Sequence, residues 1–75
     1  NINLYPNPAN SYLTLQADVN EELEFGIYDM TGKLIETGSF TMLKTIDVSN
    51  FKNSVYFIKI SNSENQLIKK FIVEN

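Results

Sequence analysis

Apolar and polar residues alternate along several short stretches of the chain, which is the pattern of strands with one buried face. In the clearest example, Leu23, Phe25 and Ile27 would point inward while the glutamates between and before them point to solvent. No stretch repeats apolar residues at helical spacing over ten or so positions. The pattern therefore predicts strands and no helix.

Seven strands are expected, because turn residues recur at the spacing of about 8–12 positions that is typical of sandwiches and barrels. Their predicted bounds are Ile2–Tyr5, Tyr12–Ala17, Glu22–Asp29, Leu34–Phe40, Thr45–Val48, Ser54–Ile60 and Gln66–Glu74. That count and spacing predict an all-β fold, a small antiparallel Ig-like β-sandwich, built as a single domain of residues 1–75.

The connections between these strands carry specific turn signals. Asp29 to Lys33 is typical of a type I hairpin turn, with Asp29 capping and Gly32 in the left-handed conformation. The polar residues 18–21 form either a hairpin turn or a crossover between two sheets. Gly38 weakens its strand and is expected to mark a bulge. Phe51 is expected to close one end of the core.

The last strand has two alternative registers. Lys69 interrupts the face that Phe71 shares with Val73. A bulge at Lys69 and Lys70 would let Ile68 and Phe71 both point inward, because a bulge resets the alternation. Without a bulge, a lysine must extend its charge out from an apolar face.

Composition limits the possible functions. The 43% apolar share, with nine aromatics, is enough for one core. Without cysteine or histidine the chain has no disulfide, no thiolate metal site and no Ser/His or Cys/His couple, so we expect neither a cofactor nor an enzyme. A net charge of −3 argues against nucleic acid as a partner. No apolar run is long enough for a transmembrane segment, and no signal peptide opens the chain.

Two local features have a simple structural interpretation. The acidic residues Glu21, Glu22 and Glu24 lack the spacing of a calcium loop, so a solvated strand edge is favoured. The prolines Pro6 and Pro8 each remove a ladder donor, so their segment belongs at a sheet edge or an entry to the fold. A rigid lead-in that protects a sheet edge is the structural interpretation.

Four segments in order resemble the type A C-terminal sorting domain of the type IX secretion system of Bacteroidota: Tyr5–Asn10, Tyr28–Ile35, Val55–Ile60 and Lys69–Val73. The resemblance covers nearly the whole chain. It implies an N-terminal cargo domain in the same polypeptide, carried into the periplasm by a signal peptide of its own. Translocon and shuttle components would then pass the cargo across the outer membrane to the cell surface or the medium, where a surface signal peptidase usually removes the sorting domain.

The resemblance also suggests recognition residues, each with a structural alternative. The candidates are Pro6, Asn7, Pro8, Gly32, Lys33, Phe57, Lys69, Lys70, Phe71 and Val73. The paired lysines of the last strand would dock to the export machinery, and the same residues would also guard an edge against aggregation. Gly32 and Lys33 also serve the hairpin turn, and Phe57 is the aromatic expected to be exposed, on an edge strand.

One departure from the family pattern concerns Ser54, which stands where the family usually has glycine. We therefore expect Asn53 to take the left-handed conformation. The chain begins with Asn1 and not with Met, which suggests a longer parent polypeptide. The alternative function is an Ig-like structural or carbohydrate-binding module that stays on an extracellular protein.

Overall fold

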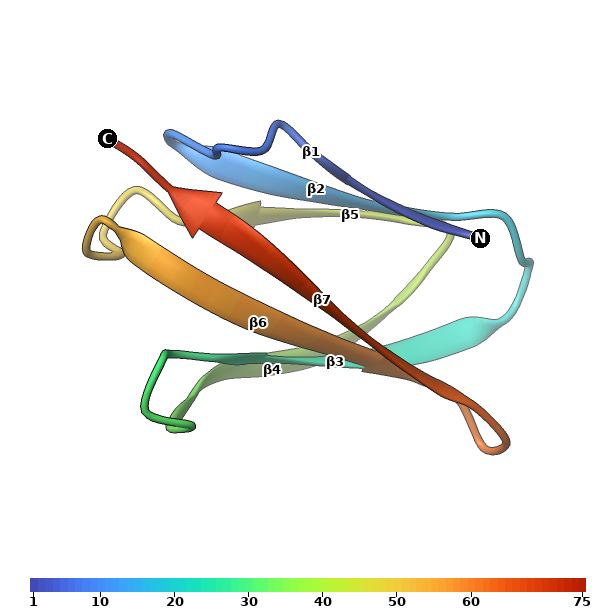
Figure 1. Ribbon diagram of the computed structural model, residues 1–75. Helices are drawn as coiled ribbons and strands as arrows, with labels where there is room; N and C mark the ends of the chain where they lie inside the picture. Colours follow the sequence, from blue (N-terminus) through green and yellow to red (C-terminus); the bar gives the residue numbers. More distant parts are fainter.

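The computed structural model describes all residues, Asn1–Asn75, and contains seven strands. They are β1 (Ile2–Tyr5), β2 (Tyr12–Ala17), β3 (Glu22–Tyr28), β4 (Leu34–Thr41), β5 (Leu43–Asp47), β6 (Ser54–Ser61) and β7 (Gln66–Val73). They form two antiparallel sheets, β1-β2-β5 and β4-β3-β6-β7, that pack face to face (Figure 1). The predicted all-β sandwich of seven strands is confirmed. No helix of this structure could cross a membrane.

The chain passes between the two sheets several times. Residues 18–21 form a crossover from β2 to β3, which settles the alternative left open by the sequence. A second crossover joins β4 to β5, where Met42 takes a positive φ of 68°. The fourth strand lies in the sheet of β3, β6 and β7, whereas constant-type immunoglobulin domains place it in the sheet of the first strand.

The core lies between the sheets and takes side chains from both. It comprises Ala9, Leu13, Leu15, Ala17, Leu23, Phe25, Ile27, Phe40, Ile46, Val48, Tyr56, Ile58, Ile60, Phe71 and Val73. The predicted inward face of β3, Leu23, Phe25 and Ile27, is among them. Tyr56 links two other rings, with centroids 5.6 Å from Phe71 and 5.2 Å from Phe51. Phe51 is half-buried against the core, as the sequence predicted.

The β3–β4 turn has the predicted Asp29 cap and the predicted left-handed glycine. The Asp29 Oδ1 accepts hydrogen bonds from the Thr31 amide at 2.9 Å, the Thr31 hydroxyl at 2.6 Å and the Lys33 amide at 3.0 Å. Gly32 adopts φ 89°, a left-handed conformation that glycine takes without a Cβ penalty. The hydrogen bond from the Thr31 hydroxyl, together with those from the Lys33 and Thr31 amides, holds the pKa of Asp29 below its ordinary value of 3.8.

We expect acid to destabilise the domain through this turn and through Asp47, whose pKa the Ser49 hydroxyl and amide lower in the same way. A lowered folded-state pKa contributes stability above the ordinary value, and that contribution is lost as the pH falls through the folded value. The urea midpoint should therefore hold from neutral pH down to about pH 5 and fall below about pH 4. Asp29→Asn should flatten the fall, and an unchanged fall in this variant would contradict the assignment.

The predicted bulge at Gly38 is wrong. Gly38 pairs regularly with Phe25, and the register between β3 and β4 shifts instead between Ile27 and Tyr28, beside the turn. Packing explains why a glycine stands at this position: a Cβ here would lie 3.0 Å from two ring carbons of Phe25. The glycine lets the Phe25 ring lie against the backbone of β4.

The last strand contains no bulge. All eight residues of β7 pair in regular register with β6, so Ile68 points outward and is 58% exposed. Lys69 therefore lies on the inner face and is half-buried. This is the register without a bulge, in which a lysine extends its charge out from an apolar face. This is possible because β7 is an edge strand, so a long side chain on its inner face can reach solvent past the edge.

The predicted left-handed conformation of Asn53 is also wrong, because Met42 is the non-glycine residue with positive φ. Asn53 uses its side chain instead: its Oδ1 accepts a hydrogen bond from the Asn75 amide at 2.9 Å.

Candidate functional site

The segment after β1 leaves its own sheet and reaches the edge of β7. The Ile72 amide donates to the Asn7 Oδ1 at 3.0 Å, and the Ala9 amide donates to the Ile72 carbonyl at 2.7 Å. The Glu74 amide donates to the Ala9 carbonyl at 2.8 Å, and Ala9 forms a parallel bridge with Val73. The proline-rich segment thus protects an edge, as predicted, but the edge belongs to the last strand of the other sheet.

The end of the chain is tied down by a third segment. Besides the Asn53 contact, the Asn75 side-chain amide donates to the Phe51 carbonyl at 3.1 Å. We call Asn7, Ala9, Phe51 and Asn53 the C-terminal clamp, because together they hold residues 72–75. Figure 1 shows the C-terminus beside the β1–β2 and β5–β6 connections, at one end of the sandwich. The last residues are therefore part of the fold and not a free tail.

The structure brings three of the candidate residues together. Asn7, Lys69 and Lys70 line one hollow with β1 residues Ile2, Asn3 and Leu4, on the side of the sandwich where β1 and β7 are edge strands. Lys70 is exposed on the outer face of its sheet, while Lys69 is half-buried on the inner face. Pro6 and Pro8 flank Asn7 and are exposed. This cluster combines the first and the last predicted motifs.

The remaining candidates do not line this hollow. Phe71 and Val73 are 0% and 1% exposed, so in the folded domain no partner reaches their side chains. Phe57 is 37% exposed and pairs with Lys70 on the outer face, but its strand β6 lies inside the sheet and is not the expected edge strand.

The turn candidates occupy the same end of the sandwich as the clamp (Figure 1). Gly32 lines a shallow hollow with Phe57 and Ile68, whereas Lys33 lines another with Phe51. The hollow of Gly32 reaches β7 at Ile68, but neither this hollow nor that of Lys33 includes Lys69 or Lys70.

Sequence reasoning missed Ala9 and Asn53 as parts of the clamp. Ala9 acts through its backbone and is fully buried, and an alanine after two prolines carries no signal of such a contact. The sequence analysis singled out Asn53 because asparagine tolerates a left-handed backbone, whereas in the structure its side chain accepts a hydrogen bond.

We expect Asn7→Ala to lower the free energy of unfolding by about 0.5–1.5 kcal/mol, the net contribution of one hydrogen bond. The change removes the acceptor of the Ile72 amide at the end of the β7 edge. Chemical denaturation measures the loss, and Asn10→Ala at a nearby exposed position is the matched control. Equal stability of the two variants would show that the Asn7 contact does not hold the strand.

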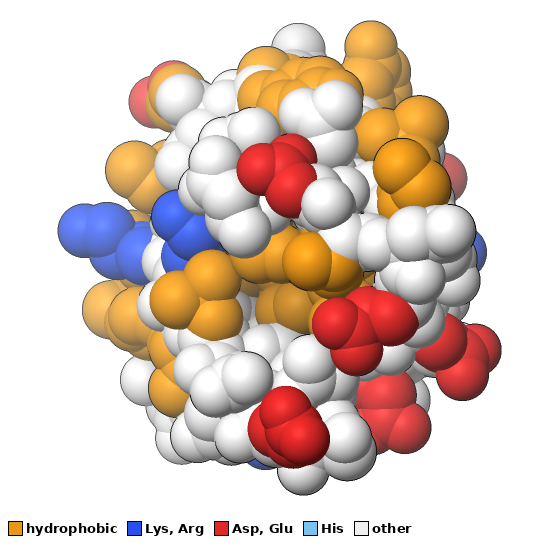
Figure 2. Space-filling model, turned by 90° about the vertical axis from the view of Figure 1, so that its right-hand side faces the viewer, with side chains coloured by type: hydrophobic (Ala, Val, Ile, Leu, Met, Phe, Trp, Pro, Cys, Tyr) orange, Lys and Arg blue, Asp and Glu red, His pale blue; other side chains and the backbone are white.

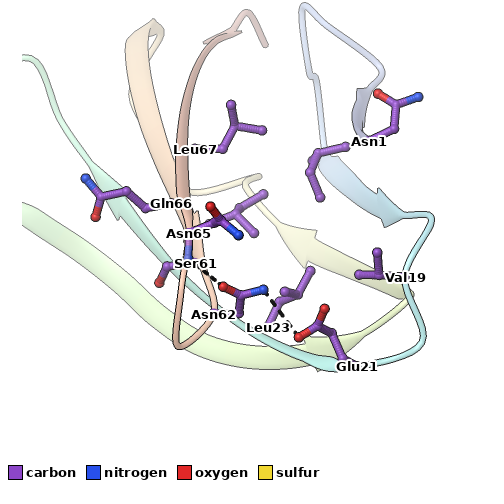
Figure 3. Close-up of a pocket in the computed structure, with 11 residues that line it drawn as sticks. Asn1, Val19, Glu21, Leu23, Ser61, Asn62, Asn65, Gln66 and Leu67 are labelled. Atoms are coloured by element: carbon purple, nitrogen blue, oxygen red, sulfur yellow. Dashed lines mark hydrogen bonds between the residues drawn. The ribbon is translucent and has the colours of Figure 1, made fainter.

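The opposite end of the sandwich carries a second hollow with an apolar floor. Ile2, Leu23, Ile60 and Leu67 contribute to this floor, and Figure 3 shows Leu23 and Leu67 with Asn62 and Glu21 at its rim. The Asn62 side-chain amide donates to Glu21 at 3.3 Å. Figure 2 shows this end with apolar side chains recessed at its centre, lysines mainly at the left, and acidic side chains gathered at the right and scattered above and below the centre.

The acidic residues at this end form no metal site. No group of three or more acidic side chains is placed to hold an ion. Glu22 and Glu24 lie on the outer face of β3, paired with Thr41 and Ser39 of β4.

Comparison with known proteins identifies both a family and a fold. The sequence model of the family described as "Secretion system C-terminal sorting domain" matches residues 3–74. The fold is similar to the crystal structure of a DUF3244-family protein from Bacteroides vulgatus ATCC 8482, described as an immunoglobulin-like β-sandwich. The TM-score is 0.82 at 21% identity, over 97% of this chain and 84% of the other. No curated protein matches the chain.

Proposed function

Because the chain belongs to the family of type IX secretion system C-terminal sorting domains, we propose that residues 1–75 direct an N-terminal cargo domain across the outer membrane. Translocon and shuttle components bind the folded domain in the periplasm and deliver the cargo to the cell surface or the medium. A surface signal peptidase then removes the domain. The observation that carries this proposal is the family match over residues 3–74.

The positions of the two ends of the chain support this proposal. The chain begins beside the β2–β3 connection, at the end of the sandwich that also carries the β6–β7 connection and lies opposite the C-terminal clamp (Figure 1). A cargo attached before Asn1 would leave the clamp and the adjoining part of the β7 edge accessible. The cluster of Asn7, Lys69 and Lys70 on that edge is the surface that we propose the export machinery binds.

A reporter fusion tests the proposal. A fluorescent protein with a periplasmic signal peptide is expressed in a type IX host with and without this domain at its C-terminus. We expect the fusion at the cell surface or in the medium, with a mass that lacks the domain, and the bare reporter in the periplasm. Retention of the intact fusion in the periplasm would sink the proposal, and binding to a glycan array would then favour a carbohydrate-binding module.

A further inference from the structure

The edge of β7 is closed over only part of its length. The Ile72 amide and carbonyl point away from β6, since they bond to Asn7 and Ala9. Backbone groups alternate in direction along a strand, so those of Lys70 and Ile68 point the same way. No strand pairs with β7 on this side, and the parallel bridge of Ala9 reaches only Val73. The segment 66–70 therefore presents unpaired backbone donors and acceptors at an open edge.

The open edge faces a groove between the two sheets. Ile2 lines both the hollow that contains Lys69 and Lys70 and the apolar hollow that contains Leu67, so the two adjoin along β1 and β7. Inner-face side chains of a strand added to β7 would enter this groove. They would meet Ile2, Leu4 and Leu67, of which Leu67 is 41% exposed.

Charge further defines what the edge can accept. Lys69 and Lys70 sit in the middle of β7 on its two faces, in a domain whose net charge is −3. Carboxylates on both faces of an added strand would complement these two ammonium groups. Leu67 and Ile68 precede the lysines in β7 and would contact apolar residues of the added strand.

We propose that the open edge of β7 over residues 66–70 binds an extended segment of a partner protein as an added strand. The segment carries a pair of acidic residues beside Lys69 and Lys70 and an apolar residue that enters the groove beside Ile2 and Leu67. Main-chain hydrogen bonds supply affinity and the side chains supply selectivity, as in other cases of strand addition. The inference rests on the proposed function in taking this partner to be part of the export machinery.

A second copy of this chain is a poorer occupant of the same edge. Pairing two β7 strands would bring four lysines onto one ribbon, and no acidic residue lies within 66–70 to offset them. Lysines at this position are the usual protection against such homotypic pairing. Self-association through β7 is nevertheless one outcome that the experiment below would detect.

The test uses two synthetic six-residue peptides, acetylated and amidated, that alternate valine and threonine and carry two glutamates at one end. One has the acidic pair at its C-terminus for parallel pairing, the other at its N-terminus for antiparallel pairing. Titration of the whole domain is followed by amide chemical shifts. We expect a dissociation constant of about 1 mM or tighter for one of them, with the amide resonances of Ile68 and Lys70 shifting most.

Matched controls separate strand addition from charge attraction. N-methylation of the peptide amides that face β7 should abolish binding, whereas methylation of the alternate set should preserve it. Ile68→Pro removes an amide that the folded domain does not use, so it should leave the fold intact and abolish binding. Exchange of the two glutamates for lysines should weaken binding at least about tenfold.

Several results would overturn the proposal: no binding by either peptide, shifts confined to another edge, equal binding by both methylated sets, or a dimer formed through β7. If Ile68→Pro fails to fold, the methylated pair still decides the question. Export of the reporter without peptide binding would refute this inference alone. Peptide binding without export would refute the proposed function alone.

Discussion

Replacing Phe71 with alanine should lower the free energy of unfolding by about 3–5 kcal/mol, the usual cost of removing a buried phenylalanine. Phe71 is 0% exposed and stacks on Tyr56 with centroids 5.6 Å apart. A domain of this size has a total stability of about 4–11 kcal/mol, at about 0.05–0.15 kcal/mol per residue. The variant should therefore lose a large part of its stability, although no partner touches the side chain.

Thermal unfolding followed by circular dichroism measures this loss. We expect the midpoint to fall by more than about 12 °C, because each kcal/mol shifts a domain of this size by about 4–8 °C. Phe57→Ala is the matched control, since it deletes the same ring from the outer face of the neighbouring strand. We expect a loss of about 1 kcal/mol for the control. Similar losses for the two variants would show that Phe71 is not the buried residue described here.

Reversing both lysines of the open edge, Lys69→Glu with Lys70→Glu, should reduce reporter export at least about tenfold. Like charges facing an acidic segment cost several kcal/mol, and about 1.4 kcal/mol already corresponds to a factor of ten in affinity. Neither side chain is fully buried, so we expect the fold to survive. The surface fraction of the reporter gives the effect, and circular dichroism of the purified variant verifies folding.

The control for this variant keeps the change of charge and moves it away from the edge. Lys44→Glu with Lys52→Glu alters two exposed lysines, one on the other sheet and one in the β5–β6 connection. We expect this pair of changes to leave export within about twofold, because exposed charges away from a contact have little effect. If both double variants were exported like the wild type, the proposed role of Lys69 and Lys70 would be wrong.

Local patterns in the sequence predict most of the fold. Alternation placed Leu23, Phe25 and Ile27 inward, and the Asp29 to Gly32 turn has the geometry that its residue types favour. These features depend on neighbours along the chain. The predicted bulge at Gly38 was wrong because this glycine makes room for the Phe25 ring of the adjacent strand. The local sequence does not reveal which ring packs on which stretch of backbone.

The candidate site was harder to predict because it joins the two ends of the chain. The prolines and the lysines were each noticed, but the hydrogen bond between Asn7 and Ile72 spans 65 positions. The residue types did not indicate that the first motif covers one end of the strand edge to which the two lysines belong. That arrangement follows from β1 and β7 lying on the same side of the sandwich in different sheets.

Amide hydrogen exchange in β7 of the free domain tests this arrangement most directly. We expect slow exchange at Ile72 and Glu74, whose amides bond to Asn7 and Ala9, and fast exchange at Ile68 and Lys70 on the open edge. Leu67 and Lys69, which face β6, should be slow. If Ile68 and Lys70 were protected as strongly as Leu67 and Lys69, the edge would already be paired, and the account of how this domain is recognised would be contradicted.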